Sequence, residues 1–332
     1  MGFKYSQLTD KTRQEMVEDL QEFSIYMNGL GFEVYLHYGT LLGAIRNKGL
    51  ILHDNDLDLG YISKETKPKK VIEEARELMK QFEKDGRLRA YFDLNKNKIR
   101  VRDKGVISDP AGQMHITTRR DHCTDLFTTW FDNRGNWWNH QWGILAKKED
   151  TLPLKEVVCE GVVMKAPKDT DKILKRLYGS DWMIPQEKKI QQVTNTRMSW
   201  LHFLIRDECI LKIDIKDFED LQEEAKKEGL FFTHLDKMIH YGYFIDGEIV
   251  GFGGYCPVSK TEVCFKNSYT LPEHRGKGVS TKLIRHRLEK ARKAGYKKYF
   301  GFCTKDILGL QLKAGAKQGE TDGVYTKITG KL

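Results

Sequence analysis

The sequence contains no apolar run near the roughly 18 residues that a helix needs to cross a bilayer. The opening stretch MGFKYSQLTDKTRQ also lacks the apolar centre of a secretion signal. We therefore expect a protein without a transmembrane segment that works in the cytoplasm. Residues Gly2 to Ser6 fit the loose pattern for N-myristoylation, but so short a pattern often arises by chance.

Cysteines at metal-binding spacing are absent as well, since no C-x-x-C pair occurs and no histidine stands nearby at ligand spacing. The pattern indicates reduced and mostly buried thiols. The six cysteines are Cys123, Cys159, Cys209, Cys256, Cys264 and Cys303. We also find no internal repeat, no low-complexity segment and no DNA- or RNA-binding signature, so we expect no nucleic-acid partner.

The composition is that of an ordinary soluble protein, with 39% hydrophobic and 31% charged residues, which excludes disorder and fibrous repeats. A length of 332 residues favours about two domains. Lysine and arginine number 56 against 47 acidic residues, for a net charge of +9. Such a surplus attracts polyanions, and it equally suits an enzyme that handles nucleotides or phosphate esters.

The first half of the chain interleaves helical and strand-like patterns. Apolar residues recur at helical spacing between Met16 and Met27 and again between Ile72 and Phe82. Strand-like segments cover residues 34–38, 56–61, 88–92, 98–102 and 123–131. This alternation predicts an α/β or α+β domain built on a mixed sheet with helices.

A polar stretch without a sustained period, residues 186–196, follows Pro185 and marks a domain boundary. We therefore expect domains at residues 1–190 and 191–332. The second half carries a helix near 218–228 and a hairpin about Asp246-Gly247. A strand to 271, a helix ending at Gly295 and a strand at 299–302 follow. This half is again a mixed sheet with helices.

The most informative segment is YGTLLGAIRNKGLILHDNDLDLGY, residues 38–61. In an extended strand Asp54, Asp56 and Asp58 project to one face, where three carboxylates repel each other unless a cation joins them. Magnesium, which takes carboxylate and phosphate oxygens together, is the natural neutraliser. Upstream, Gly39-Thr40 forms a tight turn before a helix, whose backbone N–H groups and hydroxyl can hold phosphate oxygens.

The alternative is that Asp54 to Asp58 is a solvated acidic loop or a calcium site. The segment lacks the glycine and the closing glutamate of an EF-hand loop. A bare D-x-D favours the solvated loop, whereas the upstream Gly-Thr turn reverses that preference. The combination predicts a site for a metal-bound phosphate ester.

The order G-T-L-L-G-A-I-R, then K-G-x-I, then D-x-D-x-D resembles the signature of the LicD/fukutin family. That family is a branch of the polymerase-beta-like nucleotidyltransferase fold. The resemblance spans roughly residues 20–185, because PLKEVVCEG at 153–161 and LYGSDWMIP at 177–185 also match later landmarks. Members typically transfer a phosphocholine or phospho-alditol group from a CDP-activated donor to a sugar.

By this resemblance Asp56 and Asp58 are the metal-binding pair, and Gly39 with Thr40 is the phosphate-side turn. The motif CTDLFTTW places Asp125 where the family has its third acidic ligand. Without the resemblance, Asp125 reads as an ordinary aspartate at a strand edge.

Arg46 matches the family's basic residue, which implies a contact with donor phosphate. Its alternative is an arginine at a helix end that interacts with the helix dipole. Three positions depart from the family: Asn47 replaces a usual His, His53 a usual Trp, and Asn55 a usual Asp. These departures bear on the sugar or base pocket more than on the metal.

The resemblance implies in-line phosphoryl transfer from a CDP-linked donor to a glycan or sugar acceptor. Magnesium, or manganese, held by Asp56, Asp58 and Asp125 would bind the donor diphosphate and neutralise the leaving CMP. Asp125 or Asp54 would take the proton from the acceptor hydroxyl. The alternative is a nucleotidyltransferase that moves NMP to a sugar phosphate or an antibiotic.

A second glycine turn, LPEHRGKGVS at residues 271–280, lies between a strand and a helix. Its closely spaced glycines let backbone N–H groups converge on an anion such as a pyrophosphate. With the preceding hairpin and the following helix and strand, it resembles the GNAT acetyltransferase fold over roughly residues 213–327. The residues that would then bind acetyl-CoA are Arg275, Gly276, Lys277, Gly278, Val279 and Ser280.

Two positions in this half depart from the GNAT pattern. Ser280 replaces a second Gly or Ala, which is a small change. Gln311 stands where many members carry a tyrosine that protonates the leaving thiolate. Glu262 is a candidate base for an amine or an ordinary exposed glutamate. The alternatives are therefore an active N-acetyltransferase and a GNAT-like ligand-binding module without catalysis.

Overall fold

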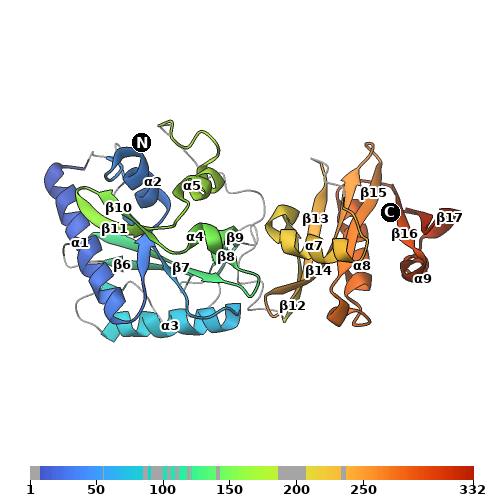
Figure 1. The fold of residues 1–332 in the computed structure, drawn as a ribbon, viewed down its shortest axis with the longest axis horizontal. Coiled ribbons are helices and arrows are strands. Elements are labelled where there is room, and N and C mark those ends of the chain that lie inside the picture. The colour runs from blue at the N-terminus through green and yellow to red at the C-terminus, as the bar shows by residue number, and fades with distance from the viewer. Residues whose placement is uncertain are drawn as a thin grey trace. The chain divides into compact units, whose positions relative to one another are not determined.

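The computed structural model describes residues 8–54, 56–84, 89–90, 100–102, 106–108, 112–117, 120, 122–139, 143–185, 207–232 and 237–332. The chain divides into two compact units, residues 1–205 and 206–332 (Figure 1). The boundary predicted at 190/191 lies outside the described residues and stays a prediction. Both units combine a mixed sheet with helices, which confirms the predicted α/β class.

The N-terminal unit begins with α1 (Asp10–Gly29), the first helix predicted from the sequence. Thr9 caps it, because its side chain accepts a hydrogen bond from the backbone N–H of Thr12 at 3.1 Å. The apolar positions that define its period, from Met16 to Met27, are buried. The helix packs near β1 (Val34–Leu36), whose three residues are all buried.

Five strands of the N-terminal sheet follow the order β1-β2-β7-β6-β3. Their bounds are β2 (Asp56–Ile62), β7 (Cys123–Phe131), β6 (Gln113–Thr117) and β3 (Arg89–Ala90). β8 (Asn136–Asn139) and β9 (Gly143–Lys147) extend the sheet from β7. β2 and β7 run parallel, whereas β1 and β6 pair antiparallel with them. The adjacent strands β2 and β7 therefore carry Asp56, Asp58 and Asp125, whereas Asp54 lies just before β2.

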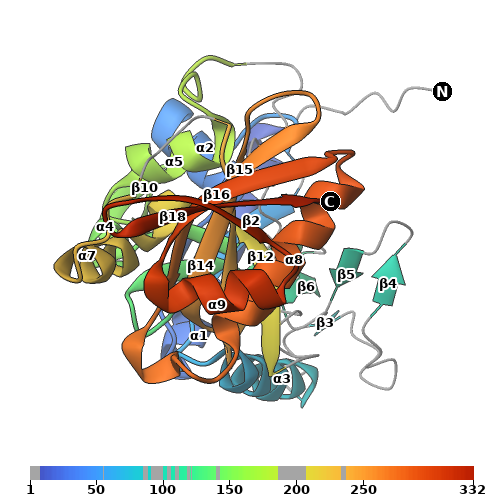
Figure 2. The same ribbon diagram turned by 90° about the vertical axis from the view of Figure 1, so that its right-hand side faces the viewer.

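Helices and small hairpins complete this unit. The helices are α2 (Tyr38–Asn47), α3 (Pro68–Lys84), α4 (Lys148–Thr151) and α5 (Thr170–Tyr178). β10 (Lys155–Cys159) pairs with β11 (Val162–Ala166), and β4 (Arg100–Arg102) pairs with β5 (Val106–Ser108) as a separate ribbon (Figure 2). Three tryptophans, Trp130, Trp137 and Trp138, are almost fully buried and form much of the core.

Seven strands form the sheet of the C-terminal unit, in the order β12-β13-β14-β15-β16-β18-β17. They are β12 (Glu208–Ile213), β13 (Ile239–Ile245), β14 (Glu248–Pro257), β15 (Glu262–Thr270), β16 (Lys298–Thr304), β17 (Lys317–Asp322) and β18 (Tyr325–Lys331). The helices are α7 (Glu219–Lys227), α8 (Val279–Lys293) and α9 (Lys305–Lys313). The hairpin predicted at Asp246-Gly247 is present, with φ of 49° and 86°, as a two-residue turn of this kind requires.

β15 and β16 are the parallel pair of the C-terminal sheet. Their ladder covers only Glu262 to Phe265 on β15, opposite Lys298 to Gly301 on β16. β15 continues to Thr270, so its second half has no ladder to β16. The ladder between the two strands thus ends well before the second glycine turn. Among the described residues, no helix has the length and apolarity to span a membrane.

Candidate functional site

The parallel pairing of β2 with β7 brings the predicted aspartates together. Asp58 stands opposite Asp125 in the register, and Asp56 stands opposite Cys123. Side chains two residues apart on a strand share a face, so Asp56 and Asp58 project toward the same side. One carboxylate oxygen from each of Asp56, Asp58 and Asp125 lies within 4.8 Å of the others. The structure therefore assembles the triad that the sequence suggested.

The first turn of α2 closes over Asp58. The backbone N–H of Gly39 donates to Asp58 Oδ2 at 2.8 Å, and the backbone N–H of Asp58 donates to Thr40 Oγ1 at 2.8 Å. A Cβ atom on residue 39 would lie 2.4 Å from Asp54 Oδ2 and 3.1 Å from Asp58 Oδ2. Only glycine leaves room for both carboxylates at this point. Thr40 is buried, and its hydroxyl joins α2 to β2. A phosphate contact by Gly39 or Thr40 stays a prediction.

The strand-to-helix junction is held by aromatic packing. Tyr38 has a φ of 32°, an unusual backbone conformation for a bulky residue that costs on the order of 1–3 kcal/mol. Its buried ring packs edge-on against Phe127 at 4.6 Å and lies 4.0 Å from the His37 ring. Burial lowers the pKa of His37 to about 3, so this residue is neutral. His37 consequently brings no positive charge to the acidic cluster.

Burial and mutual repulsion shift the carboxylates of the cluster. Burial, and next the charge of Asp56, raise the pKa of Asp58 well above its ordinary value. Burial, followed by a hydrogen bond with Asp56, raises the pKa of Asp54 to about 7. Crowded carboxylates with raised pKa values fit a divalent cation, because the cation removes the repulsion. All donors are oxygens, which suits magnesium or manganese.

We expect magnesium to stabilise the protein more at about pH 8 than at about pH 5. A carboxyl with a raised pKa binds its proton more tightly in the folded state, so the metal-free protein loses stability as pH rises from about 4 toward 7. Magnesium binds the ionised carboxylates and offsets this loss. Thermal unfolding with magnesium chloride, against sodium chloride of equal ionic strength, measures the effect. Equal shifts of Tm at both pH values would contradict it.

Asp125 has further partners on β6 that the sequence did not reveal. Gln113 Nε2 donates to Asp125 Oδ2 at 2.6 Å, and His115 Nδ1 lies in hydrogen-bond contact with Asp125 Oδ1. Hydrogen bonding to Asp125, followed by that to Cys123, raises the pKa of His115 to about 10. The sequence pattern does not predict the strand over residues 113–117. The sequence feature that could have indicated this strand is the short polar connection to the next strand, which begins at Cys123.

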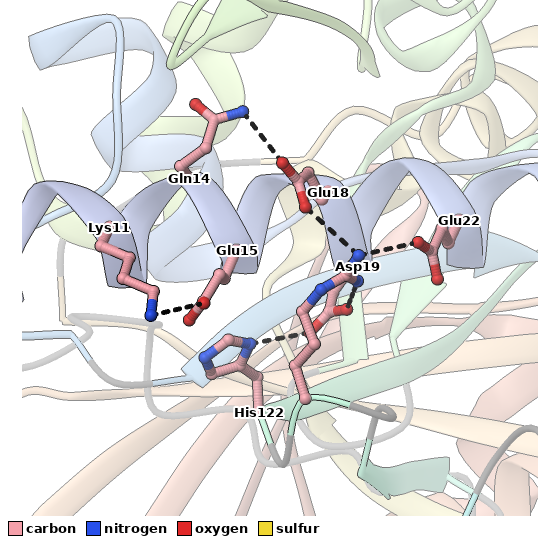
Figure 3. Close-up of polar contacts among 8 residues, drawn as sticks. Lys11, Gln14, Glu15, Glu18, Asp19, Glu22 and His122 are labelled. Carbon is pink, nitrogen blue, oxygen red and sulfur yellow. Dashed lines mark hydrogen bonds and ion pairs between the residues drawn. The ribbon is translucent and has the colours of Figure 1, made fainter.

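An ionic cluster around the buried Asp19 holds the segment that leads into β7 (Figure 3). Asp19 on α1 is almost fully buried and accepts from Arg120 and from His122 Nδ1, the latter at 2.7 Å. Arg120 also pairs with Glu18 at 3.2 Å and Glu22 at 3.0 Å. The cluster attaches α1 to the residues just before Cys123. It therefore supports the strand on which Asp125 lies.

Arg46 is the one predicted N-terminal residue that does not lie with the others. It belongs to the last turn of α2, seven residues after Gly39, or about 10 Å along the helix axis. Its Nε donates to Asn47 Oδ1 at 3.2 Å, and burial lowers its pKa. A contact between Arg46 and donor phosphate stays a prediction.

The second glycine turn leads directly into α8. Gly276 and Gly278 have φ values of 75° and 82°, a backbone conformation that residues with a side chain rarely adopt. The N-cap residue of α8 is Gly278, which has no side chain to cap the helix, so this residue leaves the first backbone N–H groups to an anion. Val279 begins the helix and is buried, whereas Lys277 is exposed. Ser280 Oγ lies 3.0 Å from Thr270 Oγ1, which joins the turn to β15.

Arg275 is held by neighbours on both sides. Its guanidinium donates to both carboxylate oxygens of Glu228, at 2.7 and 2.6 Å. Its Nε donates to the backbone carbonyl of Thr270 at 3.0 Å. The side chain therefore fixes the start of the turn against the end of α7. Direct binding of acetyl-CoA by Arg275 stays a prediction.

Two other residues considered for acetyl transfer lie apart from this turn. Glu262 is the first residue of β15, where this strand still pairs with β16 at Lys298. Gln311 is buried on α9, and its Oε1 has no hydrogen-bond partner among the described residues. Neither residue has a phenol group that could protonate the leaving thiolate.

Comparisons with known proteins agree with this organisation. Residues 31–169 match the family model described as "LicD/FKTN/FKRP, nucleotidyltransferase domain". Residues 206–307 match the "Acetyltransferase (GNAT) family". The two resemblances found in the sequence are thus confirmed, in the same order along the chain. Both are transferase domains, which classes the chain as a transferase.

Among curated proteins, the chain is similar to the uncharacterized N-acetyltransferase YjgM of Escherichia coli K12, with 40% identity over 58 residues. This match covers 17% of the chain and 35% of that relative. Among solved structures, the PaiA N-acetyltransferase of Thermoplasma acidophilum in complex with coenzyme A shows 16% identity and a TM-score of 0.33, covering 38% of this chain and all of that chain. A GNAT family acetyltransferase of Elizabethkingia anophelis with acetyl-CoA bound shows 17% identity and a TM-score of 0.31, covering 38% and 99%.

Proposed function

We propose that the N-terminal unit transfers a phosphoryl-linked group, of the phosphocholine or phospho-alditol type, from a CDP-activated donor to a glycan or sugar acceptor. The observation that carries this proposal is the convergence of Asp56, Asp58 and Asp125 beside the first turn of α2. The match to the LicD family model supports the class of reaction. A cytoplasmic place of action belongs to the same proposal.

In this proposal the three aspartates hold magnesium or manganese, which supplies Lewis-acid polarisation of the donor phosphate. The Gly39 N–H holds Asp58 in place, so that the carboxylate does not turn away from its neighbours. The acceptor oxygen forms a bond to phosphorus while the bond from phosphorus to CMP breaks. Asp54 accepts the acceptor's proton, since its pKa of about 7 lies near the range that favours a general base.

The decisive experiment for this unit incubates the full chain with CDP-choline, CDP-ribitol or CDP-glycerol, each with and without magnesium. We expect one donor to raise Tm only when the metal is present. Mass spectrometry of the products then separates the two reaction types. Phosphoryl-group transfer releases CMP, whereas a nucleotidyltransferase adds NMP to its acceptor. No stabilisation by any CDP-linked donor would count against the CDP specificity.

For the C-terminal unit we propose binding of acetyl-CoA and transfer of its acetyl group to an amine. The GNAT family match and the uncapped first turn of α8 after Gly276 and Gly278 support this. The buried Gln311 favours a second candidate, a ligand-binding module without catalysis, because an amide cannot protonate a thiolate as a tyrosine does. Release of free CoA from acetyl-CoA in the presence of polyamines, amino sugars or amino acids separates the two.

We expect Gly278→Ala to weaken CoA binding about tenfold, or about 1.4 kcal/mol. Alanine at a φ of 82° is strained by roughly 1–2 kcal/mol, and relief of that strain would move the N–H groups that face the pyrophosphate. Isothermal titration with CoA gives the affinity. Gly295→Ala is the matched control, because Gly295 has a φ of 92° and open space but lies at the other end of α8. Equal CoA affinity in the two variants would contradict the prediction.

A further inference from the structure

A second cluster of metal-ligating side chains adjoins the carboxylate triad. His115, Cys123 and Asp125 each offer one ligand atom, and these atoms lie within 4.8 Å of one another. The Sγ of Cys123 lies 3.8 Å from Asp125 Oδ1, the same oxygen that His115 Nδ1 contacts. Nothing in the proposed phosphoryl transfer uses the imidazole or the thiol. The cluster therefore needs an explanation of its own.

Strand pairing holds all three side chains on one face of the sheet. His115 on β6 stands directly opposite Asp125 on β7 in the antiparallel register. Cys123 precedes Asp125 by two residues on β7, so both side chains project to the same face. Ligands on paired strands are held more rigidly than ligands on loops, which favours metal binding. About half of the His115 side chain is exposed, which leaves an entry path for an ion.

The donor atoms distinguish this cluster from the triad. Asp56, Asp58 and Asp125 offer only oxygens, the ligands of magnesium and manganese. A nitrogen, a sulfur and one oxygen form the ligand set of zinc, which accepts all three atom types in tetrahedral geometry. Gln113 donates to the other oxygen of Asp125 at 2.6 Å, as partners of metal-binding carboxylates commonly do.

We propose that His115, Cys123 and Asp125 form a zinc site next to the carboxylate triad. Zinc replaces the proton between His115 Nδ1 and Asp125 Oδ1, and the Cys123 thiol loses its proton to solvent on binding. Three protein ligands leave the fourth position of the tetrahedron to water. The site is thus an open zinc site rather than a closed structural one.

Asp125 belongs to both ligand sets, so the two sites are coupled. Zinc on Oδ1 draws this carboxylate toward His115 and Cys123, away from Asp56 and Asp58. Zinc therefore weakens binding of magnesium or manganese to the triad, and the converse holds by linkage. This coupling rests on the proposed function of the triad, whereas the zinc site itself does not.

Cobalt, which takes the place of zinc and absorbs visible light, provides the test. The full chain in a reducing buffer is titrated with cobalt chloride. We expect one equivalent to produce the visible bands of four-coordinate cobalt and a near-ultraviolet band from thiolate-to-cobalt charge transfer, both reversed by zinc. Cys123→Ser should remove the charge-transfer band. His115→Gln should weaken cobalt binding by about 10- to 100-fold or more.

Two control variants make the outcome specific. Cys256→Ser, which replaces a buried thiol of the other unit, should keep the charge-transfer band. Asp56→Asn should keep it as well, while losing manganese binding as followed by electron paramagnetic resonance. No charge-transfer band in the wild-type chain, or a band that survives in Cys123→Ser, overturns the zinc site. Should Cys123→Ser not fold, the half-exposed His115→Gln decides, and unchanged cobalt affinity in it overturns the site.

The same titrations separate the zinc site from the proposed function. Zinc should weaken manganese binding to the wild-type chain at least about tenfold, and His115→Gln should abolish this competition. If the chain shows the cobalt band but does not bind manganese, the zinc site is supported and the metal-dependent transfer is rejected. Manganese binding without the cobalt band would do the reverse.

Discussion

Asp58→Asn is expected to lose about 100- to 1,000-fold or more of the transfer activity while unfolding, in the absence of metal, at a higher temperature than the wild type. The loss follows because Asp58 is a central member of the triad, and a metal ion stabilises the transition state by several kcal/mol. Asparagine keeps the shape and can still accept the Gly39 N–H at the same place. The fold should therefore survive the change.

The gain in stability comes from the same electrostatics that make the site fit a metal. Above its unfolded pKa, the ionised Asp58 destabilises the metal-free fold, because burial and Asp56 raise its pKa in the folded state. The neutral amide removes this cost. Without metal, a relief of ~1 kcal/mol corresponds to an increase in Tm of about 2–4 °C for a domain of this size. Calorimetry of both proteins in a chelating buffer measures it.

Asp132→Asn is the matched control for this prediction. Asp132 is also buried, but it accepts hydrogen bonds from the backbone N–H groups of Arg134 and Asn136 and from the side chains of Asn136 and Trp138. An amide cannot accept all four, so this variant should lower Tm. Retained transfer activity in Asp58→Asn would reject the metal assignment, and a lowered Tm would reject the repulsion argument.

Gly39→Ala is expected to lower the transfer rate about 100-fold, because its methyl group displaces Asp54 and presses on Asp58. The added Cβ would stand 2.4 Å from Asp54 Oδ2, closer than any ordinary contact. A carboxylate side chain can move aside, so the fold should tolerate the change, but an error of about 1 Å in a catalytic group costs on the order of 100-fold. Steady-state rates with the donor found by thermal shift measure the effect.

Gly29→Ala provides the comparison for this variant. Gly29 ends α1, and an added Cβ would meet nothing within 4 Å. Alanine there should leave activity unchanged and stabilise the helix slightly. The contrast isolates the crowding at residue 39 from the general effect of adding a methyl group to a helix. Wild-type rates in Gly39→Ala would show that Asp54 and Asp58 do not need their present positions.

Much of the triad could be predicted because its residues lie in short, ordered motifs. The alternation of Asp56 and Asp58 with apolar residues indicates one strand face, and β2 has that geometry. The place of Asp125 came from the family resemblance, since nothing local links it to the first pair. Parallel pairing between strands distant in the chain leaves no periodic trace in the sequence. Only the fold shows that Asp58 and Asp125 stand side by side.

Other features depended on tertiary contacts that the sequence pattern does not encode. The role of His115 arises from the register of β6 on β7, and the sequence pattern does not predict β6. Arg275 looked free to meet a pyrophosphate, but its Nη2 donates to both carboxylate oxygens of Glu228, which lies far away in the chain. Charged side chains pair with the groups that the fold brings close to them. Their roles were therefore the least predictable part of both sites.

The separation of β2 and β7 along the chain affects how the protein folds during its synthesis. A ribosome releases Asp56 and Asp58 well before Asp125, so a nascent chain cannot hold an ion between these strands until β7 has docked beside β2. The proposed ion, which binds only the finished arrangement, would protect mature molecules from unfolding and leave immature ones exposed to proteases. Cells short of the ion would then carry fewer copies of the enzyme, with no dedicated sensor required.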